Sequence, residues 1–261
     1  MPTVSVLIPA FRATATIREA VDSILACEAS ATGKVEVVVA PDDGSGEYAT
    51  AFAGAPGVLV LEPTWRLGPG PSRNRARAAS SGKWLTMLDA DDAVSPGYLD
   101  ELLSLAQSTR SDCVFSRIRY EHDGQPVREL PEASVLDAAA MAAFAGSIHA
   151  LYRRELWIDY PDTLAEDAFV DASLLDAVGG TAPLSGAIYR ARLRPDGICA
   201  TTPQATFNTV YRQVLGQSPS TVVTDVFAAK LTLGLLHDRH IAGGGALSFH
   251  HFVARTMNNY K

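Results

Sequence analysis

The first half of the chain alternates short apolar runs with segments whose apolar residues recur every three or four positions. Runs rich in β-branched residues predict buried strands, and the helical spacing predicts helices that cover them. The expected strands span residues 4–10, 35–40, 57–62 and 84–88, and the expected helices residues 17–25, 71–81 and about 96–106. This alternation predicts an α/β fold with a mostly parallel sheet flanked by helices.

Local signals predict where these elements begin and end. Thr16 and Glu19 have the spacing of a capping box at a helix start. Pro41 is expected to stop the second strand, and Gly82 stands where the 71–81 helix should end. Ser95 followed by proline is expected to open the helix after the fourth strand.

The pattern is looser after residue 111. It predicts a strand and turn within 113–124, an Ala-rich helical segment at 137–146 and a helix at 166–180 that ends at two glycines. A strand is expected at 186–194, and a helix at about 219–240 stops at a glycine triplet. The apolar stripe of that last helix predicts core packing, with a homodimer contact as the alternative.

Composition narrows the class of protein. The chain has 261 residues, of which 47% are hydrophobic, enough for one large shared core, and its net charge of -7 does not indicate a nucleic-acid partner. The three cysteines, Cys27, Cys113 and Cys199, fit reduced thiols. No secretion signal is visible, and no apolar run approaches the roughly 20 residues that span a bilayer. A cytoplasmic protein is expected, with any membrane contact peripheral.

Three carboxylates follow the fourth strand in "WLTMLDADD". Asp89 and Asp91 are two residues apart, so they face the same side of an extended chain, at the strand end where open α/β sheets bind ligands. Mg²⁺ and Mn²⁺ are held by carboxylates together with substrate phosphates, so a metal–diphosphate site is predicted. The alternative is a solvated turn that caps the next helix. Ala93 excludes a calcium EF-hand loop, and no phosphate-binding P-loop motif is present.

Four stretches in order, "VSVLIPAFRATATIREAVDSIL", "VEVVVAPDDGSG", "SRNRARAASSGKWLTMLDADD" and "AEDAFV", resemble the signatures of family 2 glycosyltransferases. These are inverting, nucleotide-sugar-dependent enzymes with the GT-A fold. The resemblance is strong over residues 3–100 and moderate over 147–200. It implies a nucleotide-sugar-binding half at 1–110, an acceptor-binding half at 111–215 that carries the catalytic base, and a C-terminal helical segment at 216–261.

The resemblance assigns the first donor contacts. Pro9 and Phe11 stand where the family places Pro-x-Tyr beside the nucleotide base, and Phe11 lacks the tyrosine hydroxyl. Asp42 and Asp43 match the Asp-Asp-Gly-Ser motif, whose second Asp accepts a hydrogen bond from uracil. Alternatives remain open: Phe11 can instead fill the core, and Asp-Asp-Gly also favours an ordinary turn.

Further matches concern the diphosphate and the metal. Arg73 matches the Ala-Arg-Asn motif and is implied to contact the nucleotide and diphosphate. Asp89, Ala90 and Asp91 match the metal motif, in which Asp91 is the direct ligand of Mn²⁺ or Mg²⁺ and Asp89 contacts the ribose or a metal-bound water. Asp92 is expected to support the site or to cap the following helix.

In the second half, Glu166 and Asp167 match the family's Glu-Asp pair. The resemblance makes Asp167 the catalytic base and Glu166 its orienting or acceptor-binding neighbour, although the helix dipole alone also favours acids there. A histidine completes the metal shell in some relatives, and neither His149 nor the pair at 250–251 is singled out by the sequence. The segment 189–200 resembles a family segment that leads into a loop over the donor.

The expected function is transfer of a sugar from a nucleotide diphosphate sugar, UDP-linked first of all, to a hydroxyl of a saccharide or glycolipid acceptor. Cell-surface polysaccharide or glycoconjugate synthesis is the expected setting. The main alternative is a catalytically silent sugar-nucleotide-binding or scaffold subunit. A sugar-nucleotide pyrophosphorylase is disfavoured because "PAFRATAT" lacks the glycines of its phosphate loop. Donor sugar, acceptor and oligomeric state stay open.

Overall fold

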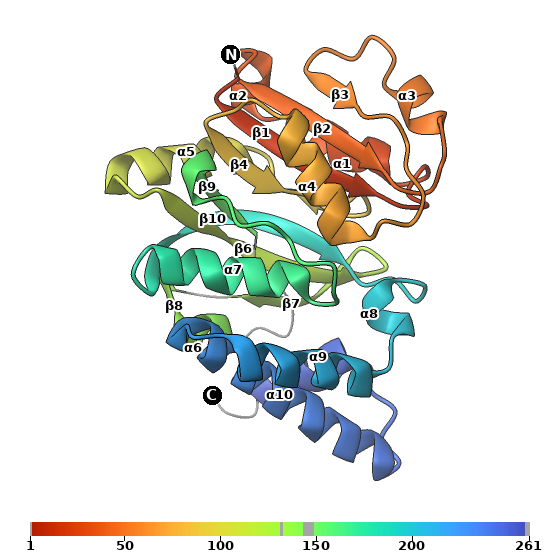
Figure 1. Cartoon of the computed structure of the whole chain (residues 1–261), viewed down its shortest axis with the longest axis vertical. Helices are drawn as coiled ribbons and strands as arrows, with labels where there is room; N and C mark the ends of the chain where they lie inside the picture. Colours follow the sequence, from red (N-terminus) through yellow and green to blue (C-terminus); the bar gives the residue numbers. More distant parts are fainter. Residues whose placement is uncertain (1, 131–132, 143–148, 259–261) are drawn as a thin grey trace.

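A single mixed sheet forms the centre of the molecule (Figure 1). The computed structural model describes residues 2–130, 133–142 and 149–258. Within these residues the strand order is β3-β2-β1-β4-β9-β6-β10-β5, with β7 beside β6 and β8 beside β10. The strands are β1 (Val4–Ala10), β2 (Val35–Pro41), β3 (Val58–Val60), β4 (Trp84–Met87), β5 (Ala93–Val94), β6 (Cys113–His122), β7 (Gln125–Leu130), β8 (Val135–Asp137), β9 (Ala150–Arg153) and β10 (Thr181–Arg192).

The first half of the sheet is parallel, as the sequence predicts: β1 pairs with β2 and β4, and β2 with β3. In the second half β6 and β10 are parallel, whereas β5, β7 and β8 pair antiparallel with their neighbours. The short strand β9, which the sequence did not predict, pairs antiparallel with both β4 and β6. Because β9 lies between the two halves, they share one sheet and one core.

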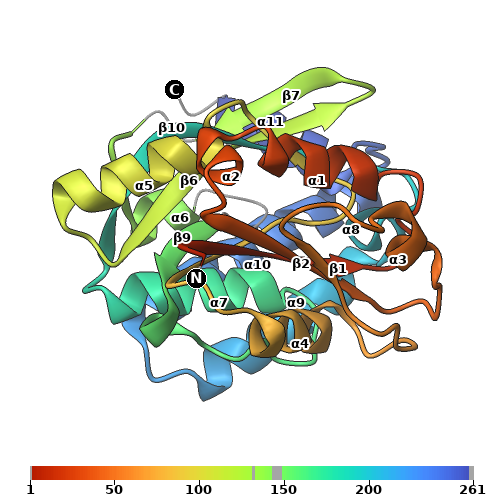
Figure 2. The ribbon, with the colours of Figure 1, turned by 90° about the horizontal axis from the view of Figure 1, so that it is seen from above.

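Helices cover both faces of this sheet (Figure 2). α1 and α5 pack on one face, α4 and α7 on the other, and α9 and α10 form an outer layer in which α10 packs against α7 (Figures 1 and 2). The helices are α1 (Ile17–Leu25), α2 (Glu28–Ala31), α3 (Glu47–Ala51), α4 (Pro69–Ala79), α5 (Tyr98–Thr109), α6 (Ala138–Ala142), η1 (Arg154–Leu156), α7 (Glu166–Ala177), α8 (Ile198–Thr201), α9 (Gln204–Gln217), α10 (Thr221–Ala242) and α11 (Phe249–Asn258).

The buried strands explain why the apolar runs are continuous. All seven residues of β1 are buried, because helices lie over both faces of the parallel strands. The core continues through large side chains that are fully buried, including Tyr48, Tyr98, Phe115, Tyr152 and Tyr189. Several of these tyrosine hydroxyls make hydrogen bonds that reach the polar end of the sheet.

The end of β2 and the start of α1 lie within one residue of where the sequence places them, but the contacts expected there differ. β2 continues through Pro41, whose register partner is Ala10, and the chain adds one more bond from the Asp42 amide to the Ala10 carbonyl. The capping box is not formed: the described side-chain contacts of Thr16 run from its hydroxyl to the Ala13 and Ala90 carbonyls. The Glu19 carboxylate is instead paired with Arg192 of β10. Tertiary partners thus replace the local cap.

The glycine at 82 also has a different role from the expected one. α4 ends at Ala79, and Gly82 lies against β1, where an added Cβ would stand 2.6 Å from the Ser5 amide nitrogen. Likewise Ser95 does not cap α5, which begins at Tyr98 after a left-handed Gly97 with φ 72°. The Ser95 hydroxyl accepts a bond from the Ile188 amide of β10. Both residues therefore serve packing between distant segments.

In the second half, the predicted helices at α7 and α10 are confirmed. α10 packs on α6, α7 and α9, so core packing explains most of its apolar stripe. The Ala-rich prediction is confirmed for α6, and its remainder at 143–146 lies outside the described residues. α9 and α11 were not predicted. Among the helices described, none has both the length and the apolar character that a bilayer crossing requires.

Candidate active site

The acids and the arginine singled out in the sequence gather at one edge of the sheet. β1, β2 and β4 run parallel, so the segments after Ala10, Pro41 and Met87 emerge side by side. The N-terminal part of α4 brings Arg73 to this edge, and the start of α7 brings Glu166. Ligands of open α/β sheets bind at such an edge, which makes it the candidate active site.

Asp42 is turned inward and fully engaged with the protein. Its side chain is buried and accepts hydrogen bonds from the Thr64 hydroxyl at 3.0 Å and from the amides of Leu67 and Gly68, both at 2.8 Å. These bonds shape the loop that leads into α4. Asp42 therefore stabilises the 64–68 loop beside the candidate active site.

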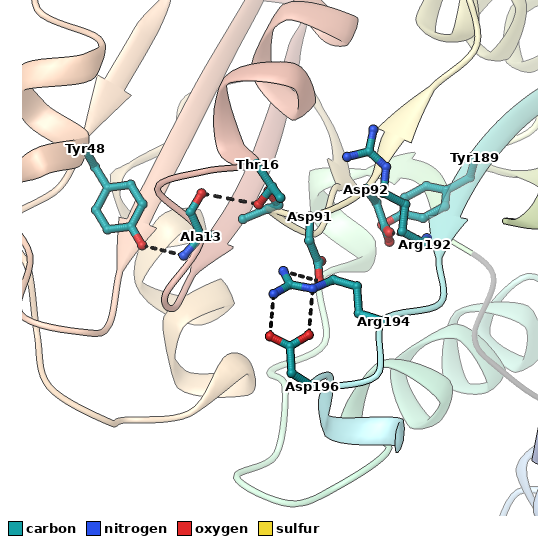
Figure 3. A network of polar contacts seen from close by, with 10 residues as sticks. Ala13, Thr16, Tyr48, Asp91, Asp92, Tyr189, Arg192, Arg194 and Asp196 are labelled. Atoms are coloured by element: carbon teal, nitrogen blue, oxygen red, sulfur yellow. Dashed lines mark hydrogen bonds and ion pairs between the residues drawn. The ribbon is translucent and has the colours of Figure 1, made fainter. Parts of the chain in front are cut away.

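Asp43 is partly exposed and fixes the loop after β1. Its carboxylate accepts hydrogen bonds from the Arg12 amide and the Tyr48 hydroxyl, both at 2.7 Å, and from the Ser45 amide at 3.0 Å. The Tyr48 oxygen in turn accepts from the Ala13 amide at 3.0 Å (Figure 3). Burial opposes ionisation of Asp43, but these hydrogen bonds outweigh it and lower the pKa. Asp43 is thus a fixed carboxylate at neutral pH.

Exposed aromatic rings and arginines surround Asp43. Phe11 is 44% exposed and Trp65 is 64% exposed, so the alternative that Phe11 fills the core is wrong. The Arg66 guanidinium lies 5.9 Å from the Phe11 ring centre and 5.7 Å from that of Trp65, and Arg12 lies 5.3 Å from Phe11. Pro9, by contrast, is buried within β1. Trp65 was missed from the sequence, although an aromatic residue in a loop rich in glycine and proline is a signal for a binding surface.

Arg73 is buried between two carboxylates. Its guanidinium pairs with Asp89 at 2.7 Å and also with Glu166, and its exposed fraction is 3%. Burial opposes the Arg73 charge, but Asp89 and Glu166 outweigh it and raise the pKa. Burial raises the pKa of Glu166 to about 7, and Arg73 opposes this shift. The buried arginine therefore ties the end of β4 to the start of α7.

The other two acids after β4 differ in exposure: Asp92 is buried against β10, and Asp91 is partly exposed (Figure 3). Asp92 is buried and accepts hydrogen bonds from the Tyr189 hydroxyl at 2.8 Å and the Arg192 amide at 2.7 Å. The Tyr189 oxygen also accepts from the Asp89 amide at 3.0 Å. Because these acids are tied to β10 and α5 starts after Gly97, the alternative that they cap the next helix is wrong.

Asp91 is the acid that stays accessible, with 34% of its side chain exposed. Its described side-chain partner is Arg194, whose Nη1 lies 3.4 Å from Oδ2. Among the described residues, no group of three or more His, Cys, Asp or Glu side chains is arranged to hold a metal. One or two carboxylates that receive a metal together with a diphosphate are a typical magnesium arrangement, and Asp91 beside Asp89 fits it.

The candidate histidines do not face this acid in an open position. His149 is buried, and its ring lies edge-on to Tyr189 with 4.7 Å between ring centres. His251 contacts His122 with ring centres 6.0 Å apart. The side chain at 250 lies outside the described residues. Burial lowers the pKa of His149, which suits a neutral ring in the core.

Asp167 follows Glu166 in the first turn of α7 and is partly buried, and its Oδ1 accepts a hydrogen bond from the Ala168 amide at 2.7 Å. α10 contributes a buried lysine, Lys230, on the face that packs toward α7. Burial lowers the pKa of Lys230 to about 8, while the charges of Asp167 and Asp171 oppose that shift. Lys230 was missed because it looked like one polar residue in an apolar stripe.

Comparison with known proteins agrees with this architecture. The mixed sheet and its flanking helices form a GT-A fold, like that of the glycosyltransferases to which the chain is structurally similar. Glycosyl transferase family 2 matches residues 5–179, and the chain belongs to this family. The resemblance seen in the sequence is therefore confirmed.

The individual proteins to which the chain is similar share 16–30% of its residues over the matched regions. The chain is 30% identical over 177 residues to the succinoglycan biosynthesis protein ExoO of Rhizobium meliloti, a match that covers 66% of this chain and 49% of ExoO. It thus spans about half the length of that relative. Residues 1–349 of S. aureus TarS in complex with UDP-GlcNAc align with a TM-score of 0.65 at 19% identity, covering 93% of this chain and 73% of that 1–349 segment. The mannosyltransferase PcManGT of Pyrobaculum calidifontis, in complex with GDP-Man and Mn²⁺, aligns with a TM-score of 0.60 at 16% identity, covering 98% and 80%.

Proposed function

We propose that this chain is a metal-dependent, inverting glycosyltransferase that moves a sugar from a UDP-linked donor to a hydroxyl of a saccharide or glycolipid acceptor in polysaccharide or glycoconjugate synthesis. One observation carries the proposal. At the ligand-binding edge of a GT-A sheet, a buried arginine joins the acids after β4 to the acid pair of α7. The UDP-GlcNAc complex of TarS and the role of ExoO in succinoglycan synthesis support this substrate class.

The donor would lie across the carboxyl ends of β1, β2 and β4. Phe11 and Trp65 offer apolar faces to the base, and Asp43, ionised at neutral pH, accepts a hydrogen bond from the uracil imide. Arg73 is fixed by its two carboxylates, so its charge is oriented before the donor binds. Asp91, with Asp89 beside it, would hold the divalent metal, which supplies positive charge to the diphosphate leaving group.

The acceptor side would use the start of α7. Asp167 takes the proton from the acceptor hydroxyl as that oxygen attacks the anomeric carbon and the nucleotide diphosphate leaves from the opposite face. Glu166 lies in the same turn and holds Arg73, which places the base and the leaving-group arginine in fixed relation. Inversion follows from this single displacement.

Thermal denaturation with nucleotides tests the proposal. UDP and GDP, each with and without Mn²⁺, are added to the unmodified chain, to Asp91→Asn and to the matched control Asp112→Asn, an exposed acid away from the cluster. We expect Mn²⁺-dependent stabilisation by UDP that Asp91→Asn loses and Asp112→Asn keeps. No stabilisation by either nucleotide at millimolar concentration would contradict the proposal.

A second readout separates an enzyme from a binding subunit. Release of UDP from UDP-sugars is measured with and without a panel of saccharide acceptors. We expect release that depends on acceptor and that falls about 100-fold or more in Asp167→Asn, because the amide cannot take the proton. Nucleotide binding without any such release across the panel would favour the scaffold alternative.

A further inference from the structure

The loop after β10 places an arginine on the acid expected to bind metal. Arg194 lies between the end of β10 at Arg192 and the start of α8, and its Nη1 is 3.4 Å from Asp91 Oδ2 (Figure 3). The same guanidinium makes two closer bonds to Asp196, at 3.0 Å and 2.8 Å. Arg194 and Asp91 are each about one-third exposed, at 32% and 34%. The arginine therefore brings a positive charge to an accessible carboxylate.

Two other arginines of the same segment, Arg190 and Arg192, are each held by an ion pair with another segment. Arg190 and Arg192 precede Arg194 at intervals of two, and each pairs with an acid from another segment. Arg190 makes a two-pronged pair with the buried Glu121, at 3.0 Å and 2.9 Å. The backbone of Arg192 is fixed by Asp92, and its side chain pairs with Glu19. Of the three, Arg194 is the arginine whose guanidinium contacts Asp91.

The two contacts of Arg194 differ in strength. The fork to Asp196 is bidentate and spans only two residues, so it moves with the loop itself. The contact with Asp91 is single, long and partly exposed, and such pairs contribute little stability. A divalent cation can therefore replace Arg194 at Asp91 without breaking the fork that shapes the loop.

We infer that Arg194 is an additional donor-binding residue that exchanges partners: it neutralises Asp91 before the donor binds, and it moves onto the diphosphate oxygens when the metal takes the carboxylate. The inference rests on the proposed function, because it requires a metal–diphosphate donor. Arginine suits both partners, since its planar fork binds carboxylate and phosphate alike. Metal and nucleotide then bind with positive coupling. The metal releases Arg194 from Asp91 for the diphosphate, and the diphosphate draws Arg194 away from the carboxylate that the metal needs.

The experiment measures metal and nucleotide binding separately. Free Mn²⁺ is followed by its electron paramagnetic resonance signal, and UDP and GDP binding by calorimetry with and without Mn²⁺. The proteins are the unmodified chain, Arg194→Met, Arg194→Lys and the control Arg212→Met. Arg212 is exposed on α9 and, within the described residues, makes no ion pair. Melting without ligand checks that every variant is folded.

For Arg194→Met we expect Mn²⁺ alone to bind about two- to fivefold more tightly, because the competing charge is gone. Nucleotide in the presence of Mn²⁺ should bind about tenfold more weakly, because one charged partner of the diphosphate is lost. The coupling between metal and nucleotide falls accordingly. Arg194→Lys should lie between the two, and Arg212→Met should match the unmodified chain.

The opposite results overturn the inference. If Arg194→Met leaves Mn²⁺ affinity unchanged or weakens it, Arg194 does not compete with the metal. If nucleotide affinity with Mn²⁺ is also unchanged, Arg194 does not contact the donor. Both outcomes leave the proposed function intact when the unmodified chain binds nucleotide with Mn²⁺. Failure of the unmodified chain to bind UDP or GDP overturns the proposed function itself.

Discussion

Replacing Arg73 by methionine tests the buried connection at the candidate active site. Methionine is of similar length but has no charge, so Glu166 loses its cation inside the protein while Asp89, 32% exposed, keeps access to water. Removing one partner of a buried pair costs about 3–5 kcal/mol, because the other charge stays behind uncompensated. The protein should therefore be destabilised, and the loss should depend on the ionisation of Glu166.

The pH dependence has a definite sign. Burial gives Glu166 a folded pKa of about 7, above its ordinary 4.5, so its contribution to stability is full below pH 4.5 and is lost as pH rises through 7. Without Arg73 the folded pKa rises further, so the loss continues above pH 7. At pH 8.5 we expect the full cost of about 3–5 kcal/mol. At pH 6, where Glu166 is mostly protonated in both proteins, the lost hydrogen bonds leave a cost of about 1–3 kcal/mol.

Urea unfolding followed by tryptophan fluorescence at pH 6 and pH 8.5 measures both values. Arg73→Met is compared with Glu166→Gln and with the double variant, in which no charge remains buried at that position. The double variant should recover about 2 kcal/mol relative to Arg73→Met at pH 8.5 and much less at pH 6. Equal destabilisation at the two pH values, or no recovery in the double variant, would refute the claim that an uncompensated Glu166 charge causes the loss.

Two further changes separate structure from binding beside β2. Asp42→Ala should lower the free energy of unfolding by about 2–4 kcal/mol, because two backbone amides and a hydroxyl lose their acceptor. Asp42→Asn should cost less. Unchanged stability together with lost nucleotide affinity would instead make Asp42 a direct contact of the ligand. Trp65→Ala should leave urea unfolding unchanged, because the ring is 64% exposed, and should weaken UDP binding by about fivefold or more in calorimetry. Unchanged affinity would place the base elsewhere.

Burial decides which parts of the fold were predictable. β1 and β2 are enclosed on both faces, so their sequences are continuous apolar runs that predict strands directly. β9 has only four residues and owes its place to β4 and β6 on either side, which no local pattern records. α9 is a different case, because Phe207, Val210, Tyr211 and Val214 follow the helical spacing and would have predicted it.

At the candidate site too, the sequence does not predict which side chains are buried and which are exposed. Asp42 and Asp43 are adjacent and chemically identical, yet one is buried under the 64–68 loop and the other faces the exposed rings. Their separation depends on bonds from residues more than 20 positions away, which the motif does not contain. Lys230 is a similar case. The sequence predicts its helix, but the carboxylates that oppose the lowering of its pKa by burial belong to α7.

The distribution of arginines resolves a difficulty that the composition raises. A chain with a net charge of -7 repels a diphosphate at long range, so binding requires cations concentrated at one place. Arg12, Arg66, Arg73 and Arg194 come from four separate segments, and each lies beside an aromatic ring or a carboxylate of the candidate site. The carboxylates that would hold the metal thus also hold arginines in place before the donor arrives. Such an arrangement brings cations to the edge where the donor is proposed to bind, and under the proposed exchange of partners the Arg194–Asp91 contact is the point at which donor binding would change the balance of charge.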